Sequence, residues 1–179
     1  ANINTRKNGN VLDIFMVDLG KRDYEFDKMM FQNLDSYLKQ IIEHKEKIDK
    51  KVSEKAKKYH KKSVFKEKNE VFFDNVSSEK YTIREVFAQD HMGLLFEITK
   101  TLAHLNLDIH FSRISTLGDR AVDVFYVFKN GSKIEDEKEL EELRNSLIKC
   151  ISYSRWQDAP ETINVVGRNK FKVLFLTLL

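Results

Sequence analysis

Apolar and polar positions along residues 81–134 predict a strand, a helix and two further strands. Residues 81–88 alternate with one apolar-rich face, as a half-buried strand does. A helix is expected next, because apolar residues recur at three- and four-residue steps, at Leu94, Leu95, Ile98, Leu102 and Leu105. Residues 107–116 and 121–127 then read as strands joined by a glycine-containing turn. A second helical stripe at residues 140–151 completes the order β-α-β-β-α, with a closing strand to follow.

The second half of this pattern occurs twice. Residues 11–17 match residues 121–127 at a constant offset of 110 residues, and the aspartate, the phenylalanine and the final valine are identical. Each run follows a polar turn and precedes a helical pattern, which covers residues 26–42 in the first copy. The first strand and helix of the first copy would fall before residue 1. The sequence therefore predicts a fragment with an α+β fold, in which one nearly whole domain follows the second half of another.

These patterns divide the chain into three parts. Residues 1–75 are the partial first copy, including a lysine-rich helical linker at about 45–70 and a closing strand at 71–75. Residues 76–151 are the second domain, and residues 152–179 are an unassigned tail whose apolar end, 172–179, reads as a strand. Acidic residues are interspersed in the linker, so we expect a solvated helix there and no nucleic-acid partner.

Composition narrows the class of protein. The chain has 179 residues, of which 33% are charged and 41% hydrophobic, with a net charge of +3. This charge is too small to indicate nucleic-acid binding. The single cysteine, Cys150, excludes a disulfide within the chain and a multi-cysteine zinc site, and it favours a reducing, cytoplasmic compartment. No apolar run reaches the ~20 residues of a membrane span, so we expect no membrane partner.

A candidate ligand site lies where the first strand of the second domain meets its helix. Helix N-termini present unpaired N–H groups and a partial positive charge, and glycine lets a ligand approach the backbone. These features suit the carboxylate of an amino acid. Asp90 would accept a hydrogen bond from the ammonium group of the same ligand. The candidate ligand-binding residues are Asp90, His91, Gly93 and Leu94. On residue types alone a structural reading stays open, in which Asp90 caps the helix and Gly93 only packs.

Three stretches carry a resemblance to a known family. They are Val-Phe-Phe-Asp-Asn at 71–75 with the strand at 81–85, Ala-Gln-Asp-His-Met-Gly-Leu-Leu at 88–95, and the two strands at 114–127. This part of the chain resembles an ACT domain, a small ferredoxin-like regulatory fold. More narrowly, residues 3–150 resemble the C-terminal ACT tandem of the bifunctional uridylyltransferase/uridylyl-removing enzymes (GlnD family). Residues 4–17 correspond to the first ACT repeat.

The resemblance implies a sensing function. It implies binding of an amino acid, most plausibly glutamine, and regulation of an enzyme that modifies the nitrogen-signalling protein PII. It also implies pairing between ACT domains, within or between chains. The family loop usually reads Asp-Arg-Pro-Gly-Leu-Leu, and here His91 and Met92 replace the arginine and the proline. The loop is therefore expected to be less preorganised, and it lacks a fixed charge.

The chain carries no catalytic motif. It lacks the paired aspartates with which a nucleotidyltransferase holds magnesium, and no histidine precedes an aspartate as in the family's hydrolase. The resemblance places both activities, and the Mg²⁺, in domains absent from this segment, which itself needs no cofactor or metal. Three alternatives stay open: an ACT module of another metabolic or stress-response enzyme, a dimerisation module without ligand, and an RNA-recognition motif. Against the RNA-recognition motif, the chain lacks the glycine-containing aromatic strand that is typical of that motif.

Overall fold

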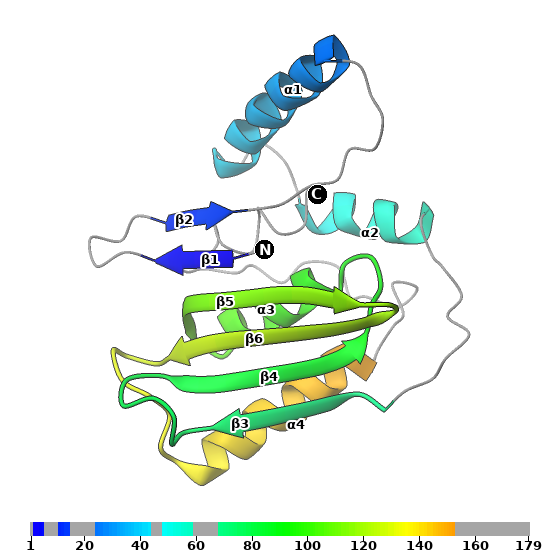
Figure 1. The fold of residues 1–179 in the computed structure, drawn as a ribbon. Coiled ribbons are helices and arrows are strands. Elements are labelled where there is room, and N and C mark those ends of the chain that lie inside the picture. The colour runs from blue at the N-terminus through cyan, green and yellow to red at the C-terminus, as the bar shows by residue number, and fades with distance from the viewer. Residues whose placement is uncertain (1, 6–10, 15–23, 44–47, 59–67, 153–179) are drawn as a thin grey trace.

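The computed structural model describes residues 2–5, 11–14, 24–43, 48–58 and 68–152, and the account below concerns those residues. Six strands form one sheet (Figure 1). The strands are β1 Asn2–Thr5, β2 Val11–Ile14, β3 Glu70–Asp74, β4 Thr82–Gln89, β5 Asp108–Leu117 and β6 Arg120–Phe128. The helices are α1 Tyr24–Ile42, α2 Ile48–Lys58, α3 Leu94–His104 and α4 Glu137–Ser152.

The sheet is antiparallel throughout, in the order β2-β1-β5-β6-β4-β3. Strands β4, β5 and β6 with helices α3 and α4 reproduce the predicted β-α-β-β-α order, and both helices lie behind the sheet in Figure 1. The prediction of an α+β, ferredoxin-like fold is confirmed. The hairpin β1–β2 extends the same sheet, because β1 pairs with β5 at Asn2 and Arg113. The partial copy and the second copy thus lie side by side in one chain.

Strand β3 lies at the edge of the sheet, beside β4. The sequence placed this segment at the end of the first copy, but its register, with Val71 opposite Val86, joins it to the sheet of the second copy. Hydrogen bonds reinforce this position, because the Arg144 guanidinium of α4 donates to the Val71 carbonyl at 2.8 Å. The division of the chain into repeats at residue 75 remains a prediction. The apolar run at 172–179 lies outside the described residues.

The core lies between the sheet and helices α3 and α4. Ile98, Leu102, Leu143 and Leu147 from the helices are at most 2% exposed. They pack on inward positions of the central strands, which include Val86, Phe125 and Val127. Helix α2 lies outside this core and packs Val52 and Ile48 against Phe96 of α3. Burial of these apolar stripes, at ~25 cal/mol per Å², holds the helices to the sheet.

The two ends of α3 have different backbone geometry. Asn106 adopts a positive φ of 58°, and the N–H groups of Asn106 and Leu107 donate to the carbonyls of Ala103 and Leu102. This is the left-handed helix end expected of asparagine. At the start, the interpretation of Asp90 as N-cap is wrong, because Gly93 holds that position with φ 91° and no side chain caps the first turn. Glycine adopts this conformation without the steric cost that a Cβ would add.

Candidate functional site

The loop of residues 90–93 joins β4 to α3 and lies against the tip of the β5–β6 hairpin. The Asp90 N–H donates to the Asp119 carbonyl at 2.8 Å, and the Thr116 hydroxyl donates to Asp90 Oδ2 at 3.3 Å. Asp90 itself is exposed. The carboxylate that the sequence selected is therefore held in place by the hairpin and faces solvent, where a ligand has access to it.

The first turn of α3 begins immediately after this loop. The Leu94 N–H donates to the His91 carbonyl at 3.1 Å, and the Glu97 N–H donates to the Gly93 carbonyl at 3.0 Å. The Leu94 side chain is 3% exposed and belongs to the core. Of the four candidate residues, Leu94 is thus engaged through both its side chain and its N–H. Asp90 and Gly93 are the two that the fold leaves at the surface of the loop or at the open end of the helix.

His91 is half-buried and turned toward its own loop. Its Nδ1 lies 3.1 Å from the Met92 carbonyl, so this ring nitrogen donates a hydrogen bond to the backbone. The next residue, Met92, has 38% of its side chain exposed. The imidazole therefore stiffens a loop that lacks the proline of the related family, while the methionine provides apolar surface at its rim.

Asp123 lies below the loop, and the sequence reasoning missed it. This residue of β6 is 2% exposed, and its Oδ1 accepts a hydrogen bond from the Ser115 N–H at 3.3 Å. Burial raises the pKa of Asp123 to about 7, the Ser115 bond opposes the shift, and the charge of Asp90 adds to it. One feature of the sequence pointed to this residue: Asp13 and Asp123 are identical in the two copies, at a position where the pattern is otherwise apolar.

Other titratable groups line the contact between α3 and α4. Burial raises the pKa of Glu97 to about 7, against the opposing charge of Lys100, and its Oε2 has no hydrogen-bond partner among the described residues. Burial also raises the pKa of the Cys150 thiol to about 12, despite a hydrogen bond with Thr101. Cys150 is therefore a poor nucleophile.

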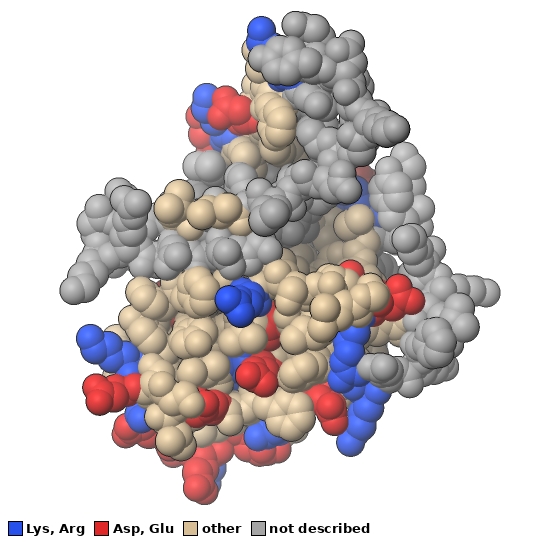
Figure 2. Space-filling model, viewed as in Figure 1, with Lys and Arg blue, Asp and Glu red and all other residues tan. Residues whose placement is uncertain are grey.

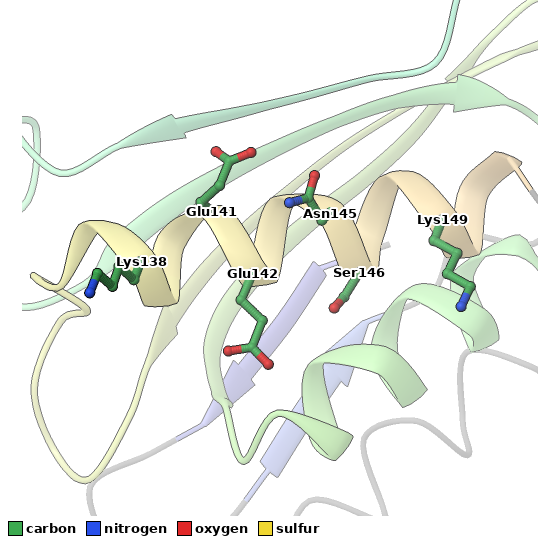
Figure 3. A pocket seen from close by; sticks show the side chains of 6 residues that line it. All are labelled: Lys138, Glu141, Glu142, Asn145, Ser146 and Lys149. Carbon is green, nitrogen blue, oxygen red and sulfur yellow. The ribbon is translucent and has the colours of Figure 1, made fainter.

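A shallow hollow occurs on the outer surface of α4. Figure 3 shows that its lining side chains all project from this one helix. They are Lys138, Glu141, Glu142, Asn145, Ser146 and Lys149. None belongs to the loop of residues 90–93, and their charges alternate as on a solvated helix surface. We therefore assign this hollow no ligand.

No group of three or more histidine, cysteine, aspartate or glutamate side chains in the described ranges is arranged to hold a metal ion. Among the helices that the structure describes, none is both long and apolar enough to cross a membrane.

Comparison with known proteins defines the class of this chain. Residues 70–155 match the family described as "ACR9-like, ACT-like domain". Together with the ferredoxin-like sheet and its two helices, this match identifies an ACT-like domain. No solved structure matches the chain.

The more particular resemblance is also confirmed. The chain is 34% identical over 154 residues to the bifunctional uridylyltransferase/uridylyl-removing enzyme of Vibrio cholerae, covering 85% of this chain and 17% of that protein. It is 32% identical over 162 residues to the enzyme of Azospirillum brasilense, with the same two coverages. It is 33% identical over 130 residues to that of a Bradyrhizobium species, covering 71% of this chain and 14% of the relative. The chain is recognised as sequence of the ACT region of this enzyme family, and it spans less than a fifth of the relatives' length.

Proposed function

We propose that this chain is an amino-acid-sensing region of a bifunctional enzyme that uridylylates and deuridylylates the PII protein in the cytoplasm. Glutamine is the proposed ligand. The segment itself takes no cofactor, and Mg²⁺ would serve catalytic domains outside it. The observation that carries the proposal is the loop of residues 90–93, where an exposed carboxylate stands beside a helix whose first turn has no side-chain cap.

The loop offers complementary groups to the two ends of an amino acid. Asp90, oriented by the Thr116 hydroxyl, accepts the ligand's ammonium group. The positive end of α3 favours the ligand's carboxylate, and the absence of a Cβ at Gly93 lets that carboxylate approach the backbone. The buried Asp123 carboxyl adds negative potential below the ammonium position when it is ionised. The two halves together favour a zwitterion, because the carboxylate half alone would bind any simple acid and the Asp90 half alone any simple amine.

Regulation requires that the ligand prefer one arrangement of the attached domains. The loop lies against the β5–β6 hairpin, and β5 pairs with β1 of the partial first copy. A ligand that orders this loop therefore acts on the strand through which the two copies are joined. In the parent enzyme this coupling would shift the balance between uridylylation and deuridylylation.

Calorimetry with glutamine tests the proposal, on a chain extended to two full repeats. Asp90→Asn removes the ammonium acceptor and is expected to weaken glutamine binding about tenfold or more, since hydrogen bonds to charged groups contribute ~1.5–3 kcal/mol. The matched control is Asp119→Asn, because Asp119 is exposed nearby and contributes its backbone carbonyl to the loop. Absence of heat with glutamine, or equal effects of both variants, would reject the site.

A further inference from the structure

The sheet face that points away from α3 and α4 carries exposed aromatic rings. We call it the open sheet face and define it as the outward positions of β3, β4, β5 and β6. Phe72, 49% exposed, contacts Phe87 edge-on with ring centroids 5.8 Å apart, and Phe111 contacts Tyr126 at 5.5 Å. Figure 2 shows this side of the molecule, where uncharged residues cover most of these strands and charged residues are scattered among them. Such a face is a candidate interaction surface.

The charges on this face nearly balance, with Glu70, Asp74 and Glu85 against Arg113 and Arg120. Arg120 lies 3.6 Å from Glu70 and above the Phe87 ring, so it is engaged within the chain. Glu85 and Arg113 are exposed, and neither side chain makes a hydrogen bond or ion pair with another described residue. A nucleic acid requires an excess of positive charge, which this face lacks. A protein surface with its own paired charges fits better.

The unpaired charges stand in one row across the sheet. Val124 of β6 pairs with Glu85 of β4 on one side and with Arg113 of β5 on the other. Directly paired residues share a face of the sheet, so the acid, the valine and the base lie side by side. Consider a half-turn about an axis that runs parallel to β6, above Val124 and midway between two facing sheets. It exchanges the positions of β4 and β5. The row is therefore complementary to its own image.

We propose that the open sheet face binds the same face of a second copy of this chain, related by this two-fold axis. Glu85 of each copy then lies over Arg113 of the other, and the axis passes between the two Val124 side chains. Packed sheets are ~10 Å apart, a gap that a glutamate and an arginine side chain reach across together. A two-fold axis perpendicular to the strands would instead oppose Glu85 to Glu85 and Arg113 to Arg113. The charge pattern thus selects one orientation.

The size of the face sets the strength of the dimer. An axis along β6 lays β4 over β5 and β3 over β1 of the other copy, so five strands of 4 to 10 residues take part. At ~4.8 Å between strands and ~3.3 Å per residue, they present roughly 600 Å² per copy, or roughly 1,200 Å² for the pair. This lies at the lower end of specific interfaces, so the dimer is expected to depend on concentration. Burial of the aromatic rings supplies the affinity, and the two Glu85–Arg113 contacts determine register and orientation.

Sedimentation equilibrium of the 179-residue chain over a range of concentrations measures the dissociation constant. Glu85→Arg and Arg113→Glu each place two like-charge contacts in the dimer, and each is expected to weaken it about tenfold or more. The double variant Glu85→Arg/Arg113→Glu restores both contacts and returns the dissociation constant to near that of the original chain. A mixture of the two single variants forms a heterodimer, because each then supplies the charges that the other lacks. Circular dichroism verifies that every variant is folded.

Matched controls are Glu142→Arg and Lys138→Glu, which make the same charge changes on the outer surface of α4 and leave the dimer unchanged. The proposal is overturned if the chain stays monomeric at every concentration, or if the single variants dimerise as well as the original. It is also overturned if the double variant is as weak as the singles. Binding of a single-stranded oligonucleotide that Glu85→Arg strengthens would assign the face to a nucleic acid instead.

Discussion

Replacing Arg84 by methionine should make this protein more stable. Arg84 lies on β4, fully buried beneath α4, and its Nε, Nη1 and Nη2 have no hydrogen-bond partner among the described residues. Its guanidinium Cζ is 3.7 Å from the centre of the Phe73 ring, and the Cζ of Arg144 is 4.5 Å from the same ring. A buried charge with no opposite charge beside it is among the costliest arrangements in a core.

The magnitude follows from the pKa of this group. Burial, and to a smaller extent the charge of Arg144, lower the pKa of Arg84 from the usual arginine range to about 9. At ~1.36 kcal/mol per pKa unit, this drop corresponds to roughly 5 kcal/mol of destabilisation when the group is charged. Contact with the Phe73 ring returns about 2 kcal/mol. Arg84→Met keeps an unbranched apolar chain of similar length, so the free energy of unfolding should rise by about 3 kcal/mol, within the range seen for such replacements.

The pH dependence of the free energy of unfolding tests the same prediction independently. Below pH 9, Arg84 is protonated in both the folded and the unfolded chain, so its cost is fully present and the advantage of the variant is constant. Above pH 9, and up to the pKa of arginine in the unfolded chain, the unfolded chain binds more protons than the folded one, so the original chain gains stability as pH rises. The advantage of Arg84→Met should therefore be equal at pH 6 and pH 8 and smaller at pH 10.

Urea unfolding followed by circular dichroism, at one low protein concentration, measures both effects. Lys138→Met is the matched control, since it removes one positive charge from an exposed position of α4 and should change stability by less than about 0.5 kcal/mol. A loss of more than about 1 kcal/mol in Arg84→Met would refute the reasoning. It would mean that water or a bound anion satisfies the guanidinium in solution.

Three further predictions concern single groups. Because the pKa of Asp123 is about 7 in the folded chain, the original chain should lose stability as pH rises from 4 to 8. Asp123→Asn should reduce this loss by about 2–4 kcal/mol, as measured by urea unfolding at each pH. The slope that remains should come from Glu97, whose pKa is also raised to about 7. Asn106→Ala should cost about 1 kcal/mol in urea unfolding and Asn106→Gly should not, because only the former strains the left-handed helix end; equal losses would contradict this. Cys150 should react with a thiol reagent at pH 8 about a hundredfold or more slowly in the folded than in the unfolded chain, because burial raises its pKa to about 12.

The sequence predicted the elements well where a single periodicity dominates. The leucine and isoleucine stripe of α3 and the alternation in β5 and β6 are local patterns, and the helix ends at the asparagine that permits it. The start of α3 was assigned to Asp90, because aspartate and glycine both favour N-cap positions and only backbone geometry distinguishes them. The position of β3 beside β4 depends on pairing between distant residues, which no local pattern records.

The two faces of the central strands were harder to distinguish. In β4, Arg84 and Glu85 are adjacent, so each face carries one charge and alternation alone does not indicate which is buried. Packing decides it, because Phe73 and α4 cover Arg84 while nothing described covers Glu85. In β6 the residues between Arg120 and Phe128 are apolar on both faces except for Asp123, so alternation did not indicate that this aspartate is buried.

The two proposed surfaces meet in the β5–β6 hairpin. Its tip holds Asp90 through Thr116 and the Asp119 carbonyl, while Arg113 and Val124 lie a few residues away on the open sheet face. A ligand that orders the tip and a second copy that orders the strands act on the same element, so each should change the affinity of the other by the same factor. The factor can be measured on a chain extended to two full repeats. It is the ratio of the glutamine dissociation constants of the dimer and of the monomeric Glu85→Arg variant. Identical constants would mean that the hairpin is already rigid and that the two sites are independent.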